Sequence, residues 1–169
     1  TIRDGRLTKN TIRRVLAMVE SARGGGADVV VVTCSSIGPA ASLAQQIFEF
    51  PVIRVDEAMA ELAVRTGGKV GVAATLETTL APTVGLIREK AAAAGRDVSI
   101  VESLCEGAFA AVLAGDTATH DRILGESLTR LVNDVDVVVL AQASMARVVD
   151  QLPPEARRTP MLSSPVLAV

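Results

Sequence analysis

Short runs of β-branched residues alternate with longer segments of helical period along the chain. In the longer segments, hydrophobic residues recur every three or four positions. This alternation is typical of βαβ units arranged around a parallel sheet. Because a helix follows each apolar strand, both faces of the sheet should be covered. The sequence therefore predicts an α/β fold with parallel strands.

The first helix shows how the boundaries are set. Residues 8–23 place Ile12, Val15 and Val19 on one face, and three glycines at 24–26 end the pattern. The same reasoning predicts strands at 28–33, 52–55, 69–74, 98–101, 137–140 and 161–162. The expected helices are 8–23, 37–48, 57–65, 78–94, 107–113 and 119–133, with a last one starting at Ser144.

The chain contains an internal repeat. Residues 28–37, DVVVVTCSSI, align with residues 136–145, DVVVLAQASM, at an offset of 108 (136 − 28). The flanking segments align as well: PVI at 51–53 with PML at 160–162, at an offset of 109 (160 − 51), and the helix 8–23 with the helix 119–133. Two valine-rich strands can look alike by chance, but the matching flanks favour two related halves.

We place these halves at residues 1–66 and 67–165. Related α/β halves face a common crevice with the carboxyl ends of their strands, and ligands bind in such crevices. At the repeat offset, Cys34 corresponds to Gln142 (142 − 34 = 108). The two side chains are therefore expected on opposite walls of one crevice.

Composition excludes several classes of partner. The net charge is −2, and the 17 lysines and arginines are scattered, so we expect neither nucleic acid nor membrane as a partner. The longest uncharged run, 29–48, contains Gly38 and Pro39, so it predicts a strand followed by a helix rather than a membrane span. With two cysteines and one histidine, neither a disulfide framework nor a metal site is expected. A cytoplasmic location is the expectation.

Cys34 is the first candidate for chemistry. It lies where a buried strand ends and a helix begins, beside the backbone N–H groups of Ser35 and Ser36. Such a position favours a thiolate and creates an anion site next to the sulfur. The alternative is a small buried side chain at a strand end, a common fate of free cysteines.

Other polar residues follow the expected strands. Thr75 comes directly after strand 69–74, and Thr78 and Thr79 either cap the next helix or join the same binding turn. Gln142 can donate and accept hydrogen bonds but cannot exchange a proton at neutral pH. For Cys105, with acidic neighbours, we expect a structural role, and for His120 a solvated position.

Around these residues the sequence resembles the aspartate/glutamate/hydantoin racemase superfamily, over essentially the whole chain. The segments that carry the resemblance are TCSSIGP at 33–39, VIRVDEAMAELAV at 52–64, VGVAATLETTLAPT at 70–83 and CEGAFAAVLAGD at 105–116. The last of these is typical of the hydantoin-racemase-like branch.

The resemblance implies two Rossmann- or flavodoxin-like halves with parallel sheets, related by a pseudo-twofold axis, with the ligand crevice between them. It implies that no cofactor is needed, that a small carboxylate or hydantoin-like molecule is the substrate, and that the protein forms a homo-oligomer, a dimer or larger. On the same resemblance, the family's first strand would precede Thr1, and the C-terminal end of the chain would complete the first half in its place.

The resemblance also assigns roles to residues. Cys34 would be one acid/base, acting at the substrate α-carbon. Substrate binding would fall to the residues around the two strand ends, namely Thr33, Ser35, Ser36, Ala74, Thr75 and Ala143.

The chain departs from the family pattern at one position. VLAQASMA at 139–146 aligns with a motif that carries the second cysteine, so Gln142 occupies the place of the second acid/base. Three outcomes stay open: racemase-like chemistry with another proton carrier, a decarboxylase or lyase that uses Cys34 alone, and a non-catalytic binding protein.

Overall fold

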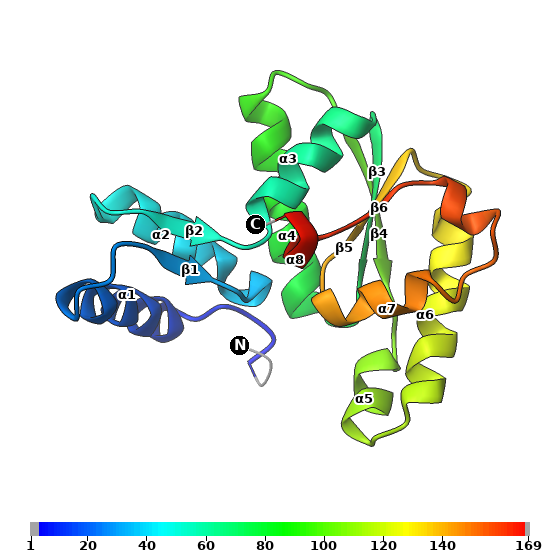
Figure 1. The fold of residues 1–169 in the computed structure, drawn as a ribbon, viewed down its shortest axis with the longest axis horizontal. Coiled ribbons are helices and arrows are strands. Elements are labelled where there is room, and N and C mark those ends of the chain that lie inside the picture. The colour runs from blue at the N-terminus through cyan, green and yellow to red at the C-terminus, as the bar shows by residue number, and fades with distance from the viewer. Residues whose placement is uncertain (1–3, 168–169) are drawn as a thin grey trace.

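The computed structural model describes residues 4–167 and shows two parallel sheets (Figure 1). The smaller sheet pairs β1 (Val30–Val32) with β2 (Val52–Arg54). The larger has the order β4-β3-β5-β6 and contains β3 (Lys69–Ala74), β4 (Ser99–Leu104), β5 (Val137–Leu140) and β6 (Met161–Ser163). Every strand pair is parallel, which confirms the predicted α/β fold.

The helices lie between the strands, as the alternation predicted. They are α1 (Lys9–Gly24), α2 (Gly38–Ile47), α3 (Glu57–Thr66), α4 (Glu77–Ala93), α5 (Ala108–Leu113), α6 (Thr117–Leu131), α7 (Ala146–Val149) and α8 (Ser164–Leu167). Short 3-10 turns occur at Ser35–Ile37, Ala143–Met145 and Ala156–Arg158. Within residues 4–167 no helix is long and apolar enough to cross a membrane.

The internal repeat is present in the hydrogen-bonded register. In the smaller sheet Val30 pairs with Val52, and in the larger sheet Val138 pairs with Met161. These positions differ by the sequence offsets of 108 (138 − 30) and 109 (161 − 52). The bond from the Val30 N–H to the Pro51 carbonyl, 3.0 Å, likewise recurs between Val138 and Pro160 at 2.8 Å. The two strand pairs are therefore copies of one local structure.

The helices before these strands match in the same way. Thr8 caps α1 by accepting a hydrogen bond from the Thr11 N–H, and Asp116 caps α6 by accepting one from the Thr119 N–H. Both caps lie at the offset of 108, and both satisfy a backbone donor of the first helical turn. The repeat thus covers helix, strand and following turn.

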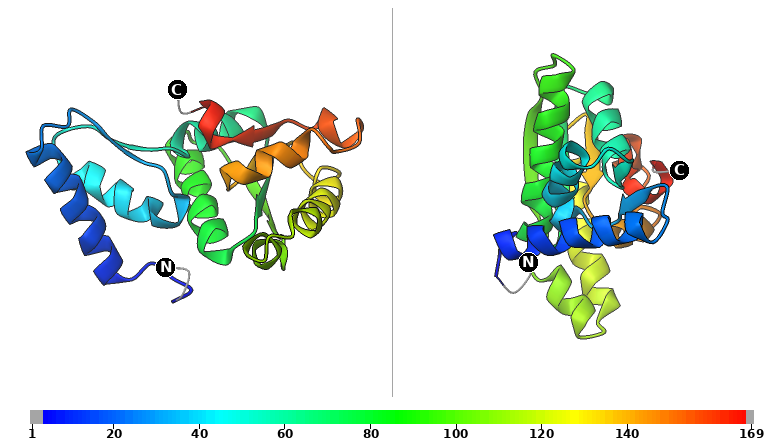
Figure 2. Two further views of the ribbon diagram at one scale, coloured as in Figure 1. Left: turned by 60° about the horizontal axis from the view of Figure 1, so that its bottom comes forward. Right: turned by 90° about the vertical axis from the view of Figure 1, so that its left-hand side faces the viewer.

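Helices cover both faces of the larger sheet (Figures 1 and 2). On one face α3 and α4 pack through buried residues such as Met59, Val64 and Ile87. On the other, α5, α6 and α7 contribute Ala108, Leu124, Leu128 and Val148. The smaller sheet packs one face on α1 and α2, while Val31 and Ile53, which pair side by side, are exposed on its other face.

Helix α3 joins the two parts of the chain. It follows β2 of the smaller sheet, yet its residues Met59, Ala60 and Ala63 are fully buried against the larger one. The chain therefore crosses from one sheet to the other near residue 56. The division into halves at residues 66 and 67 stays a prediction.

Three sequence-based expectations differ from the structure. The strand at 28–33, expected to be buried, is β1, in which Val32 is buried and Val31 is exposed, because one face of the smaller sheet is open to solvent. Strand 98–101 extends as β4 to Leu104, because β4 is an edge strand in which Glu102 is exposed without breaking the pairing. The expected solvated position of His120 was wrong. Its side chain is buried, and its Nδ1 lies 2.7 Å from Asp121 Oδ1.

A buried ion pair fixes the crossing at residue 56. Arg54 donates from Nε to Asp56 Oδ1 at 3.0 Å, from Nη2 to Asp56 Oδ2 at 3.1 Å, and from Nη1 to Ser42 Oγ at 2.9 Å. Arg54 and Asp56 are only 3% and 1% exposed. The pair connects the end of β2 to α2 and to the start of α3.

We predict that Asp56→Ala lowers the free energy of unfolding by about 3–5 kcal/mol, because it leaves the Arg54 guanidinium buried without its counterion. Replacing both partners together, as Arg54→Met with Asp56→Leu, should cost less. Urea unfolding followed by circular dichroism measures both. As a control, Glu126→Ala breaks the exposed Arg122–Glu126 pair and should cost less than about 1 kcal/mol. An Asp56→Ala effect as small as that of the control would show that the buried pair does not stabilise the crossing.

Candidate active site

A crevice of about 500 Å³ lies where the two sheets present the carboxyl ends of their strands. The part of the chain before residue 67 contributes Thr33, Cys34, Ser35, Ser36 and Val55 to its lining. The part after it contributes Leu76, Thr79, Phe109, Ala141, Gln142, Ala143 and Ser164. The crevice therefore brings Cys34 and Gln142 to one cavity, as the repeat predicted.

Cys34 and Gln142 have matching local structure. Each is an extended residue two positions after its strand and precedes a three-residue 3-10 turn, with φ/ψ of −126°/112° at Cys34 and −134°/132° at Gln142. Each carbonyl accepts the bond that closes its turn, from Ile37 at 3.1 Å and from Met145 at 3.0 Å. The first N–H groups of such a turn have no partner inside it. Both walls therefore present a side chain beside backbone donors.

The thiol of Cys34 is accessible to solvent. Cys34 is exposed, whereas Ser35 and Ser36 next to it are buried. Ser36 Oγ lies 3.0 Å from Thr79 Oγ1, so the turn after β1 is bonded to the start of α4. An exposed thiol held by a buried turn does not fit a packing role for Cys34.

Gln142 is held by Thr75 on the neighbouring strand end. Its Oε1 accepts two hydrogen bonds, from the Thr75 N–H at 2.7 Å and from Thr75 Oγ1 at 2.8 Å. Because β3 and β5 pair directly, Thr75 and Gln142 follow adjacent strands. Thr75 itself is buried behind Gln142.

The sequence-predicted site residues thus separate into three groups. Thr33, Cys34, Ser35, Ser36, Gln142 and Ala143 line the crevice together. Thr75 reaches it only through its bonds to Gln142, and Ala74 is fully buried in the core at the end of β3. Their roles in binding a substrate stay predictions.

Several lining residues were not singled out from the sequence. Val55 and Ser164 differ by 109 positions, so extending the repeat two residues past Ile53 and Leu162 would have found both. Leu76 and Phe109 carry no such signal. Phe109 reaches the crevice from α5, and no sequence pattern indicated that this helix would lie there.

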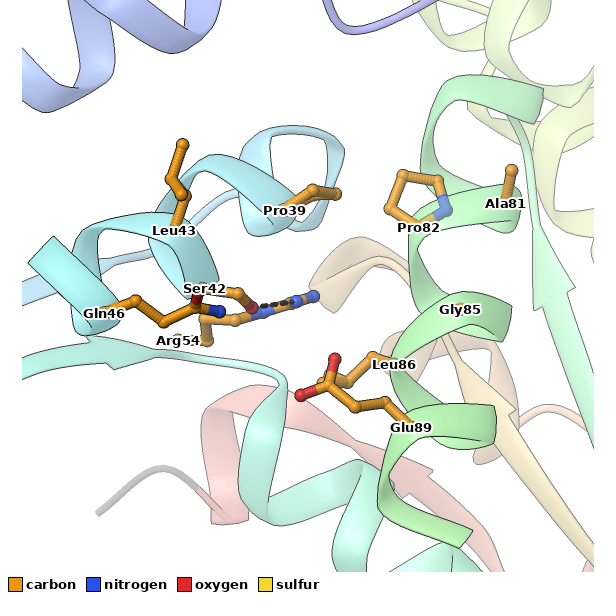
Figure 3. A pocket seen from close by; sticks show the side chains of 10 residues that line it. All are labelled: Pro39, Ser42, Leu43, Gln46, Arg54, Ala81, Pro82, Gly85, Leu86 and Glu89. Carbon is orange, nitrogen blue, oxygen red and sulfur yellow. Dashed lines mark hydrogen bonds between the residues drawn. The ribbon is translucent and has the colours of Figure 1, made fainter. Parts of the chain in front are cut away.

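A second, larger cavity of about 670 Å³ lies between α2 and α4 (Figure 3). It is lined by Pro39, Ser42, Leu43, Gln46, Arg54, Ala81, Pro82, Gly85, Leu86 and Glu89. It contains no thiol or imidazole, and its arginine is already bonded to Asp56 and Ser42. The chemistry of the lining, rather than the volume, therefore favours the crevice with Cys34. Among residues 4–167 no cluster of three or more histidines, cysteines and carboxylates could hold a metal ion.

The sequence profile of the Asp/Glu/hydantoin racemase family matches residues 1–169. The chain belongs to this family. Comparison with curated protein sequences finds no match.

Solved structures of the family have the same fold. Glutamate racemase from Bacillus anthracis is 20% identical with a TM-score of 0.73, and the match covers 97% of this chain and 64% of that one. Glutamate racemase from Francisella tularensis, in complex with D-glutamate, is 15% identical with a TM-score of 0.71, covering 97% and 63%. Allantoin racemase from Klebsiella pneumoniae is 21% identical with a TM-score of 0.68, covering 94% and 63%. The racemase-family chain described here thus spans about 63–64% of these proteins.

We predict that iodoacetamide modifies Cys34 and leaves Cys105 unmodified under native conditions. Cys34 is exposed, whereas Cys105 is 1% exposed and burial raises the pKa of its thiol, which disfavours the reactive thiolate. Intact-mass measurement should show one adduct, and peptide mapping should place it on Cys34. The Cys105→Ser variant should give the same single adduct and Cys34→Ala none. Equal labelling of both cysteines would contradict the buried position of Cys105, and an unlabelled Cys34 would contradict its exposed position.

Proposed function

We propose that this chain provides the proton-transfer site of a cofactor-independent, racemase-like enzyme in which Cys34 is the acid/base. The substrate would be a small carboxylate or a cyclic amide with an acidic C–H at its α-carbon. One observation carries the proposal: in a chain of the Asp/Glu/hydantoin racemase family, an exposed thiol faces a crevice beside the N–H groups of a helical turn.

The proposed chemistry needs two contributions from the protein. The Cys34 thiolate would take the α-proton, forming an S–H bond as the C–H bond breaks, and the electron pair would move onto the adjacent carbonyl oxygen. That oxygen then carries negative charge and requires hydrogen-bond donors that are already in place. The N–H groups at the start of the turn Ser35–Ile37 can supply them.

The opposite wall limits what the reaction can achieve. The Gln142 amide cannot act as a general acid or base at neutral pH, so inversion would require water or another group on that face. This supports a second candidate reaction. In a decarboxylase, the C–C bond to a substrate carboxylate breaks, carbon dioxide leaves with the electron pair remaining on the α-carbon, and the Cys34 S–H group protonates that carbon. A single proton carrier is sufficient for this reaction.

The substrate is also part of the proposal. The Francisella tularensis relative was solved with D-glutamate, and the Klebsiella pneumoniae relative is an allantoin racemase. The substrates to be tested therefore include both amino-acid carboxylates and cyclic ureides.

We expect Cys34→Ala to lower the rate of α-proton exchange by at least about a hundredfold, because it removes the group that takes the proton. The measurement is deuterium incorporation from D₂O at the α-carbon, followed by proton NMR with the enantiomers of glutamate, aspartate and allantoin and an enzyme-free blank. Cys105→Ala is the matched control and should retain the wild-type rate. Full activity of Cys34→Ala would remove Cys34 from the mechanism.

The same protein variants, incubated in addition with malonate substrates, distinguish the two reactions. An aminomalonate or arylmalonate substrate that releases carbon dioxide, together with no deuterium exchange in the amino acids, would favour the decarboxylase. Ligand binding with neither exchange nor carbon dioxide release would show a protein that binds without turnover.

A further inference from the structure

The hydrogen bonds to Thr75 determine how the Gln142 amide is oriented. The Thr75 N–H can only donate a hydrogen bond, and it lies 2.7 Å from one end of the Gln142 amide. That end must therefore be the carbonyl oxygen, which also accepts the bond from Thr75 Oγ1 at 2.8 Å. The amide NH₂ group is consequently directed away from Thr75.

The NH₂ group has no acceptor from the protein among residues 4–167. Gln142 is half-buried and lines the crevice that also contains Cys34. An amide N–H that is partly removed from water loses free energy unless it finds an acceptor. The crevice therefore contains a fixed donor that requires an oxygen acceptor from a bound molecule or from water.

The position of this donor is rigid. Gln142 follows β5, Thr75 follows β3, and the bond from the Ala141 N–H to the Ala73 carbonyl, 2.9 Å, holds the two strand ends together. A donor held in this way can bind an oxygen without reorganisation, which is the property required to stabilise developing negative charge.

We propose that Gln142 binds the carboxylate or carbonyl oxygen next to the reacting α-carbon, and that proton exchange consequently takes place on the Cys34 face alone. The binding role follows from the amide geometry, whereas the stereochemical consequence rests on the proposed function of Cys34. Thr75 is a positioning residue in this scheme, because it acts through the Gln142 amide.

The exchange step conserves the protons and electrons of the substrate. The Cys34 thiolate takes the α-proton, the C–H electron pair moves onto the oxygen bound by Gln142 Nε2, and the thiol proton exchanges with solvent through the open crevice. The electron pair then returns to the α-carbon, which takes a proton or deuteron from the same sulfur. The configuration is retained, because the Gln142 wall delivers no proton.

Calorimetric titration with the enantiomers of glutamate and aspartate tests the binding role. Gln142→Glu keeps an oxygen for both Thr75 donors but replaces the NH₂ group with an anionic oxygen, so the affinity for the best-bound member of the panel should fall about a hundredfold. Gln142→Met removes the donor without adding charge and should lower it about tenfold. Thermal unfolding of each variant checks that the fold is retained. An unchanged affinity in Gln142→Glu, or no binding of any panel member by the wild type, would overturn the proposal.

Thr75 variants test the positioning role. Thr75→Val removes one of the two hydrogen bonds to Gln142 Oε1 and should weaken ligand binding about fivefold. Thr75→Ser retains the hydroxyl donor and should bind the ligand as tightly as the wild type. A role of Thr75 in stability alone would change the unfolding midpoint of Thr75→Val without changing its affinity. That result would overturn the assignment of Thr75.

The stereochemical arm uses the wild type in D₂O, with each pure enantiomer incubated separately. Deuterium should enter the α-position while chiral chromatography shows the starting configuration. Inversion that keeps pace with deuterium incorporation would overturn one-sided exchange. Failure of the proposed function would give a different result. Cys34→Ala would still catalyse α-proton exchange, while carboxylate binding would still depend on Gln142.

Discussion

The direct pairing of β3 with β5 is the constraint on which the site depends. Parallel strands end at the same edge of a sheet, so this pairing places Thr75 and Gln142 next to each other although 67 positions separate them in sequence. The pairing is buried on both faces, and strand residues such as Val70, Val137 and Val139 are fully inaccessible to solvent. The rigidity of a hydrophobic core is thus transmitted to a polar amide in a solvent-accessible crevice. A glutamine on a mobile loop would lack this fixed orientation.

The repeat connects this arrangement to the other wall. The same strand, turn and pairing register occur on both sides, so a thiol and an amide occupy equivalent positions relative to their backbones. What differs is the chemistry of the side chain. A thiol can lose and regain a proton, whereas an amide acts at neutral pH only as a donor and acceptor of hydrogen bonds. In the proposed function, proton transfer consequently belongs to the Cys34 wall and oxygen binding to the Gln142 wall.

Much of this could be predicted from the sequence, because it depends on local patterns. The valine runs predicted the strands, and the offset of 108 predicted that Cys34 and Gln142 face one crevice. The bonds between Thr75 and Gln142 could not be predicted, since they depend on which strands become neighbours. Burial of His120 was missed for a similar reason, because its partners include Arg147 on α7, which is distant in sequence. Local composition also gave no indication that α3 would pack on the larger sheet.

The exposed valine and isoleucine of the smaller sheet have a practical consequence for work with this chain. Within residues 4–167, β1 is paired only with β2, whereas its counterpart β5 has a strand on each side. Val31 and Ile53 add apolar surface next to that open edge. An unpaired edge with apolar neighbours is a template for strand addition by another molecule. A rise in protein concentration is therefore expected to favour association of this chain through that edge.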